Sequence, residues 1–334
     1  MYIRNKVWKK KSFIALALLP LSLVFLAIII IRKKVLLRKV FNRKAPIEEP
    51  VIIVGNISVG GTGKTPLVIY LANELTARGF HPGIISRGYG RETKQIFEAT
   101  PSSSPLEVGD EPCIIARQAL DCPTFVGTDK HQVAQKLLEE HPMVNILISD
   151  DGLQHYSLER DIEICLVDGD NPFGNGFIFP AGPLREPISR LNLVDLIVTK
   201  NNLYQRHGDI PTFKMSLNGT TMIKINDPEI MQPLSNLKEK MFNAVAGIGN
   251  PHHFFELLKR NDLAFRAFPF PDHHVFSPND LKFDNPDPIL MTEKDAIKCS
   301  AFATDDWWML PVKAEIEESF IEAIIKKIRD KHGH

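Results

Sequence analysis

The sequence predicts an α/β protein in which a doubly wound, mostly parallel sheet precedes a smaller α/β domain. Short apolar runs of strand length alternate with helical patterns between residues 51 and 200, as in sheets covered by helices on both faces. The pair Asn218-Gly219 then separates two strand-like runs, which predicts a β-hairpin with a tight turn joining the domains. An uncharged apolar stretch at 13–31 predicts an N-terminal membrane helix. The expected boundaries are 1–45 for the membrane segment and basic linker, 46–211 for the first domain, and 212–334 for the hairpin and second domain.

The membrane segment consists of FIALALLPLSLVFLAIIII, residues 13–31, with basic residues on both sides. As a helix it would be about 28 Å long, close to the thickness of the hydrocarbon core of a bilayer. IRKK follows directly, without a small-x-small cleavage site, so removal as a signal peptide is not expected. The helix either crosses the bilayer or enters one leaflet with a bend at Pro20. The basic stretch at 32–44 is expected to attract anionic lipid.

Charge is distributed unevenly along the 334 residues, although 40 Lys and Arg balance 40 Asp and Glu. Residues 1–45 hold 12 basic residues and no acidic ones, which leaves 28 basic against 40 acidic residues in the remainder. A basic tail on an acidic body indicates membrane proximity and excludes a nucleic-acid-binding domain. The four cysteines lack C-x-x-C spacing, so neither a zinc site nor a disulfide framework is expected. No protein partner is predicted.

The expected elements follow in order. The first domain should contain strands at 51–57, 82–88, 124–127, 145–150, 162–168 and 196–200, and helices at 66–78, 111–120 and 129–140. The second should contain the hairpin of TFKMSL and TMIKI, strands at 242–248 and 288–292, and helices near 252–260 and 314–331.

The strongest chemical signal is GNISVGGTGKTP, residues 55–66, which follows a strand and opens a helix. This is the context of a phosphate-binding loop, whose backbone N–H groups surround phosphate oxygens at a helix N-terminus. Lys64 would reach the β- and γ-phosphates of ATP, and the Thr65 hydroxyl would bind Mg²⁺. Ser58 replaces the first glycine of the usual pattern, so Gly60 and Gly61 would supply the backbone freedom. The expected loop residues are Ser58, Val59, Gly60, Gly61, Thr62, Gly63, Lys64 and Thr65.

A second signal is ILISDDGLQH, residues 146–155, in which an apolar strand ends in two carboxylates. One carboxylate at the edge of the sheet would hold Mg²⁺, directly or through water. Asp150 and Asp151 are the candidates, and the sequence does not choose between them. The alternative is an Asp-Asp-Gly turn that only caps the strand.

Two further motifs, SRGYGR at 86–91 and EVGDEP at 107–112, follow or precede predicted elements. Arg87 and Arg91 could clamp an anionic substrate, and Asp110 could accept the proton of an attacking hydroxyl. The alternatives are solvated arginines and an N-cap aspartate.

Three later motifs also carry reactive groups: AGPLREP at 181–187, PDHHVF at 271–276 and MTEKDAIK at 291–298. The histidines of PDHHVF could orient a carboxylate base and tune its pKa. MTEKDAIK could touch a nucleotide base or cap the sheet. VTKN at 198–201 nearly matches the guanine-reading T-K-x-D pattern but is followed by Asn202 in place of Asp, which argues against a GTPase.

Taken together and in this order, these motifs resemble the tetraacyldisaccharide 4′-kinase family, the lipid A 4′-kinases of Gram-negative bacteria. The resemblance implies transfer of the γ-phosphate of ATP to the 4′-hydroxyl of tetraacyldisaccharide 1-phosphate, at the cytoplasmic face of the inner membrane. It places the base on Asp110 and its partner on His273, with Lys64 as the third catalytic residue. It implies Mg²⁺ ligands at Thr65, Asp150, Asp151 and Glu186, and substrate contacts at Arg87, Tyr89, His155 and Arg185. Lys130 stands where many members are expected to have an arginine that contacts a phosphate of the lipid.

Two other functional classes are compatible with the same motifs. A membrane-anchored P-loop NTPase switch would hydrolyse nucleotide without a small acceptor. A non-catalytic membrane scaffold that kept a nucleotide site would not need Asp110.

Overall fold

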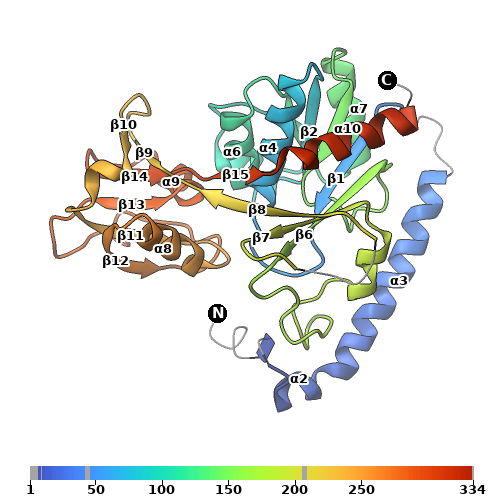
Figure 1. Ribbon diagram of the computed structural model, residues 1–334, viewed down its shortest axis with the longest axis horizontal. Helices are drawn as coiled ribbons and strands as arrows, with labels where there is room; N and C mark the ends of the chain where they lie inside the picture. The colour runs from blue at the N-terminus through green and yellow to red at the C-terminus, as the bar shows by residue number, and fades with distance from the viewer. Residues whose placement is uncertain (1–6, 9, 42–45, 205–208, 333–334) are drawn as a thin grey trace.

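The computed structural model describes residues 7–8, 10–41, 46–204 and 209–332 (Figure 1). The predicted N-terminal helix over 13–31 is divided into α2 (Phe13–Ala17) and α3 (Leu19–Phe41), with Leu18 as the C-cap of α2. Pro20 lies in the first turn of α3, where its missing N–H breaks no intrahelical hydrogen bond. None of the helices in the described residues combines the length and the apolar composition that crossing a bilayer requires. Of the basic residues noted above, Arg4, Lys6, Lys9, Arg43 and Lys44 lie outside the described residues.

The first domain is built on a nine-stranded sheet with the order β15-β8-β7-β6-β1-β5-β2-β4-β3. All neighbouring strands are parallel except β3 and β15, which pair antiparallel at the two edges. The predicted parallel sheet is therefore confirmed. The strands are β1 (Val51–Gly55), β2 (Pro82–Ser86), β3 (Phe97–Ala99), β4 (Thr124–Val126), β5 (Ile146–Ser149), β6 (Ile162–Asp168), β7 (Leu196–Lys200), β8 (Thr212–Asn218) and β15 (Lys313–Ile316).

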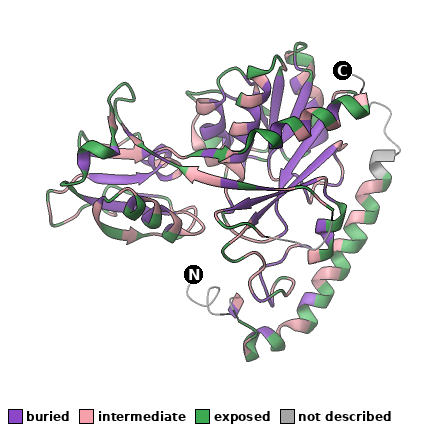
Figure 2. Cartoon of the chain, in the orientation of Figure 1, coloured by how far each residue is buried: buried purple, intermediate pink, exposed green. Residues whose placement is uncertain are grey.

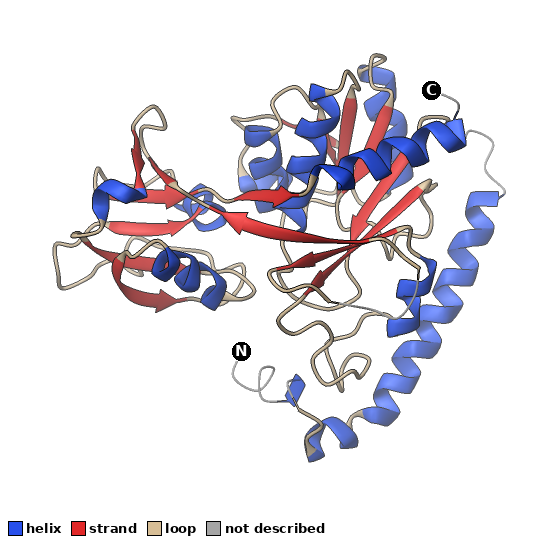
Figure 3. Ribbon diagram, viewed as in Figure 1, coloured by secondary structure: helices blue, strands red, loops and turns tan. Residues whose placement is uncertain are grey.

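Helices cover both faces of this sheet (Figure 3). The strand β1 shows why: Ile52 and Val54 pack into one core with α4, α6 and α10, whereas Val51 and Ile53 pack into the other with α7. Alternate side chains of a strand point to opposite faces of the sheet. A strand that is apolar throughout must therefore be covered by other elements on both faces. Figure 2 shows the resulting buried strands at the centre of the domain. The helices are α4 (Lys64–Ala77), α5 (Pro105–Val108), α6 (Asp110–Gln118), α7 (Lys130–Glu140), the 3₁₀ helix η1 (Ile188–Leu193) and α10 (Glu318–His332).

The second domain has a six-stranded sheet with the order β10-β9-β14-β13-β11-β12. Its separate apolar core forms around Phe242, Leu258 and Leu290. The strands are β9 (Thr221–Lys224), β10 (Met231–Pro233), β11 (Met241–Ala246), β12 (Ala264–Pro269), β13 (Ile289–Thr292) and β14 (Trp307–Leu310), and the helices are η2 (Leu234–Leu237), α8 (Pro251–Arg260) and α9 (Glu293–Cys299).

The predicted hairpin at Asn218-Gly219 is wrong. The strand before it, β8, belongs to the large sheet, and the strand after it, β9, belongs to the small one. The chain returns through β15, which pairs antiparallel with β8, so two adjacent strands connect the domains (Figure 1). A Cβ on Gly219 would lie 2.8 Å from the Pro311 carbonyl oxygen, so glycine permits this close passage of the two chains. Residues 212–218 and 313–332, assigned above to the second domain, therefore pack with the first.

Candidate active site

The phosphate-binding loop lies at the carboxyl end of β1 and leads into α4, as predicted. Gly63, the N-cap of α4, has φ +95° and makes no side-chain capping bond, so the first N–H groups of the helix remain available to a ligand. Asn56 holds the loop from within, since its Nδ2 donates to Thr62 Oγ1 at 3.1 Å and its Oδ1 accepts from Lys64 Nζ at 3.4 Å.

The segment 183–184 supports the other side of this loop. Ser58 forms an antiparallel bridge with Leu184, and Val59 N donates to Pro183 O at 2.8 Å. Ser58 therefore sits in a strand-like pairing that requires no glycine. This accounts for the departure from the usual pattern at that position.

Asp150 and Asp151 follow β5 but have different surroundings. Asp150 is buried; its Oδ2 accepts from Ser86 Oγ at 3.2 Å, whereas its Oδ1 has no hydrogen-bond partner among the described residues. Burial, helped by the nearby Glu111 charge, raises the pKa of Asp150 to about 6. A buried carboxylate oxygen without a partner in a cavity wall is suited to a cation.

Asp151 is paired with cations instead, since its carboxylate lies 3.5 Å from Lys64 Nζ and 3.2 Å from Arg185 Nη1. Burial alone would raise the pKa of Asp151, but Lys64 and Arg185 outweigh it and hold that pKa well below its usual value. The two neighbouring carboxylates are thus not equivalent, which the sequence did not reveal.

Lys130, at the start of α7, is buried behind the end of β5. Its ammonium group donates to Ser149 Oγ at 3.0 Å and to the backbone carbonyl of Asp150. Burial lowers the pKa of Lys130 to about 8. This side chain supports the Asp150 turn from inside the domain and is not among the residues that line the cavity described below.

Asp110 and His273 come together from the two domains. Asp110 is the first residue of α6 and His273 lies in a loop of the second domain; His273 Nδ1 is 3.4 Å from Asp110 Oδ2. Gly109, with φ +94°, is the N-cap of α6, so Asp110 is not the N-cap that the alternative reading proposed. The Tyr89 ring lies 5.0 Å from the His273 ring.

A cavity of about 890 Å³ lies between the phosphate loop, the two aspartates after β5 and His273. It extends from the phosphate loop across the domain junction to α3, which contributes the apolar side chains of Phe25 and Ile29 and the basic ones of Arg32 and Lys33. The predicted substrate residues all line it, namely Arg87, Tyr89, His155 and Arg185, as do Thr65, Asp150 and Asp151. Burial and the Lys130 charge lower the pKa of His155 to about 3, so its imidazole is neutral near pH 7.

Glu186, predicted as a Mg²⁺ ligand, is buried with both oxygens engaged. Its Oε1 accepts from Gln154 Nε2 at 2.9 Å and its Oε2 from the Tyr156 hydroxyl, and Arg190 Nε lies 3.5 Å away. The role of Glu186 in metal binding stays a prediction. Sequence analysis assigned no role to these three partners of Glu186: Gln154 lies within ILISDDGLQH but carries no charge, and Tyr156 and Arg190 lie outside the motifs described above. Arg91 donates to the Gln95 carbonyl and is not among the residues that line the cavity.

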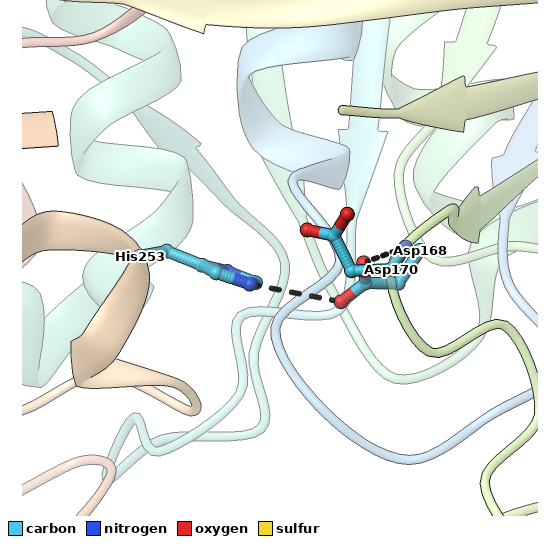
Figure 4. Close-up of side chains that lie close together, drawn as sticks. All are labelled: Asp168, Asp170 and His253. Atoms are coloured by element: carbon cyan, nitrogen blue, oxygen red, sulfur yellow. Dashed lines mark hydrogen bonds and ion pairs between the residues drawn. The ribbon is translucent and has the colours of Figure 1, made fainter. Parts of the chain in front are cut away.

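A polar cluster also joins the domains beside the phosphate loop. Figure 4 shows His253 of α8 reaching toward Asp168, at the end of β6, and the nearby Asp170. The positive charge there comes from Lys200, whose Nζ lies 2.8 Å from His253 Nδ1 and 3.9 Å from Asp168. Asn202 donates to Asp170 at 2.6 Å. The side chains that nearly match a guanine-reading motif are therefore engaged in contacts within the protein.

MTEKDAIK both caps a helix and faces the cavity. Thr292 is the N-cap of α9 and accepts from Asp295 N at 3.2 Å, while Asp295 Oδ2 accepts from Gly247 N at 2.8 Å. Thr292, Glu293 and Lys294 line the cavity. The motif thus caps a helix directly after β13 and lines the cavity, and its contact with a nucleotide base stays a prediction.

Comparison with known proteins gives one consistent family. A family profile described as Tetraacyldisaccharide-1-P 4′-kinase matches residues 14–329. The chain is 45% identical over 324 residues to a protein named tetraacyldisaccharide 4′-kinase from Methylobacillus flagellatus, covering 97% of this chain and 95% of that one. A protein of the same name from Thiobacillus denitrificans is 39% identical, with 95% and 96% covered. The crystal structure of LpxK from Aquifex aeolicus in complex with ATP is similar with a TM-score of 0.79 and 29% identity, covering 95% of this chain and 100% of that one.

Proposed function

This chain belongs to the tetraacyldisaccharide-1-phosphate 4′-kinase family, and from that premise we propose that it transfers the γ-phosphate of ATP to the 4′-hydroxyl of tetraacyldisaccharide 1-phosphate. The observation that carries the proposal is the Asp110–His273 pair, since His273 lies 3.4 Å from Asp110 and lines the same cavity as Lys64 and the phosphate loop. A carboxylate held by a histidine opposite a phosphate site is suited to an acceptor hydroxyl. A nucleotide switch has no need of this pair.

In the proposed reaction, Asp110 accepts the proton of the 4′-hydroxyl as its oxygen attacks the γ-phosphorus. The bond between that phosphorus and the oxygen bridging to the β-phosphate breaks, and ADP leaves. Lys64 and the N-terminus of α4 stabilise the negative charge on the phosphate oxygens, which is most of the catalytic task in this chemistry. His273 orients the Asp110 carboxylate toward the hydroxyl whose proton it accepts.

We place Mg²⁺ at Thr65 and Asp150, with Asp151 and Glu186 near it. The partnerless Oδ1 of Asp150 and the position of Thr65 in the same cavity wall support this placement, because Mg²⁺ prefers oxygen ligands. When bound, the ion supplies positive charge to the β- and γ-phosphate oxygens. Arg87, Tyr89, His155 and Arg185 would contact the disaccharide and its phosphate.

We further propose that α2 and α3 attach the chain to the cytoplasmic face of the inner membrane. Their apolar side chains are unusually exposed: Phe13 by 86%, Leu23 by 67% and Ile31 by 62%. Such a surface is costly in water and stable in lipid, and Arg32, Lys33 and Lys34 follow it directly. The cytoplasmic side is the side that supplies ATP.

The double variant Leu23→Glu/Ile31→Glu is expected to lower binding to anionic phospholipid vesicles by more than about tenfold. Burying one such side chain contributes about 1.5–3 kcal/mol, and about 1.4 kcal/mol corresponds to a factor of ten. The measurement is co-sedimentation with vesicles. The control is Leu120→Glu/Met143→Glu, two side chains each 72% exposed on the first domain away from α2 and α3. Equal losses in both pairs would rule out α2 and α3 as the attachment surface.

The proposed activity is tested by following ³²P from the γ-position of ATP into tetraacyldisaccharide 1-phosphate in mixed micelles. Label in the lipid supports the kinase. Release of free phosphate without labelled lipid would favour the NTPase switch, and absence of both products would favour the scaffold.

A further inference from the structure

We propose that Lys294 is a positioning residue of the transfer reaction, whose ammonium group holds together the chain neighbours of Asp110 and His273 across the domain junction. The inference rests on the proposed roles of those two residues.

The geometry places one cation between two segments that each carry one member of the pair. Lys294 Nζ lies 3.3 Å from Glu111 Oε1 and 3.9 Å from Asp272 Oδ1. Glu111 directly follows Asp110 at the start of α6, and Asp272 directly precedes His273. A single side chain of α9 therefore sets the separation of α6 from the histidine loop, and with it the 3.4 Å contact between Asp110 and His273.

A second contact runs parallel to this one and fixes the direction of Lys294. Gln118, at the end of α6, donates to Glu293 Oε2 at 2.5 Å. The two contacts run from neighbouring residues in the first turn of α9 to the two ends of α6, and the helices pack directly. Lys294 is thus anchored by its own helix and is not a mobile surface lysine; its side chain is only 16% exposed.

The charges require such a cation. Asp110, Glu111 and Asp272 bring three carboxylates to the junction, and like charges this close repel one another. Burial would lower the pKa of Lys294, but Glu111, Asp272 and Asp110 together raise it, so the ammonium form persists. Apart from Lys294, the basic side chain near Asp272 Oδ1 among the described residues is His273, whose Nε2 lies 3.8 Å away. Without Lys294, the repulsion would widen the gap that His273 must span.

The histidine loop also needs support because its backbone is strained at His273. His273 adopts φ +58°, a conformation that side-chain-bearing residues avoid without external support. Lys298, one turn along α9, donates to His274 O at 3.1 Å. The helix α9 therefore supports both sides of His273, with Lys294 on the side that faces Asp110.

The experiment is a double-mutant cycle measured by label transfer to the lipid, with Lys294→Met, His273→Ala and the combined variant. Lys294→Met is expected to lower kcat about 10- to 100-fold, since a misplacement of about 1 Å can cost 10²-fold. The KM for ATP should change little, and Lys294→Arg should recover most of the rate. In the His273→Ala background, Lys294→Met should have an effect below about threefold, because the alignment that it supports is already lost.

Other outcomes overturn the proposal. An equal effect of Lys294→Met in both backgrounds, or a large rise in the KM for ATP, would indicate a direct contact with the nucleotide. An unchanged kcat would leave Lys294 without a role. Lys224→Met serves as the control, because Lys224 of the second domain pairs with Asp305 at 3.2 Å away from the junction. If Lys294→Met does not fold, Glu111→Gln removes the same contact from the other domain and should give the same pattern. Absence of transfer in the wild type would instead refute the proposed function.

Discussion

Replacement of Asp110 by alanine is expected to lower the rate of phosphoryl transfer to the lipid by about 10²- to 10⁴-fold, the contribution typical of a positioned general base. The reason is geometric, since Asp110 is the first residue of α6 and lies 3.4 Å from Nδ1 of His273, which lines the cavity. The loss should fall on kcat. The KM for ATP should change little, because Lys64 and the phosphate loop, the proposed nucleotide site, remain in place.

The matched control is Glu139→Ala, which removes an exposed carboxylate from α7 and should leave the rate unchanged. Both variants are assayed with the same micelles and compared for thermal stability. Transfer that persists at the wild-type rate in Asp110→Ala would exclude Asp110 as the base but keep the kinase assignment. It would also remove the premise on which the role of Lys294 rests.

The first domain was predictable because its signals are local. Three contiguous segments show this: the strand Val51–Gly55, the glycine-rich turn and the helix Lys64–Ala77. Each has a residue pattern that is typical of its own conformation. The parallel order followed from apolar strands separated by helices. The residues of the phosphate loop and the two aspartates after β5 could thus be placed on one edge of the sheet before the structure was known.

The domain connection was not predictable in this way. An Asn-Gly pair between two strand-like runs has the same local chemistry whether the strands pair with each other or join different sheets. At Asn218 the choice is made by β15, which arrives from about a hundred residues later and takes the place of a hairpin partner. The same return places Phe320 and Ile324 of α10 in the core of the first domain. Such pairing depends on long-range packing, which a window along the sequence does not contain.

The support of the site was also hidden from the sequence. Lys130 stands where many family members were expected to have an arginine that contacts a phosphate of the lipid, and its side chain lies beneath Asp150. Tyr156 and Arg190 hold Glu186 from inside the domain. Sequence motifs identify groups that face a ligand, because the ligand constrains the spacing of those groups along the chain. The residues that hold those groups come from several elements and follow the packing of the fold.

The replacement Asp150→Asn is expected to have the second large effect, and its comparison with Asp151→Asn distinguishes the two carboxylates. Asp150 keeps Oδ1 free of protein partners, whereas Asp151 pairs with Lys64 and Arg185. Asp150→Asn should therefore weaken Mn²⁺ binding, followed by electron paramagnetic resonance, by at least about tenfold. Transfer should fall about 10²-fold or more, since a catalytic metal contributes several kcal/mol and about 1.4 kcal/mol is a factor of ten.

Asp151→Asn should have the opposite pattern. Metal binding should change by less than about threefold, while the KM for ATP should change, because Lys64 and Arg185 lose their shared counter-charge. Asparagine keeps the volume of each side chain, and in Asp150→Asn its amide oxygen can still accept from the Ser86 hydroxyl, so the comparison isolates the charge. Equal losses of Mn²⁺ binding in the two variants would contradict the assignment, because only a metal shared by both carboxylates would respond in that way.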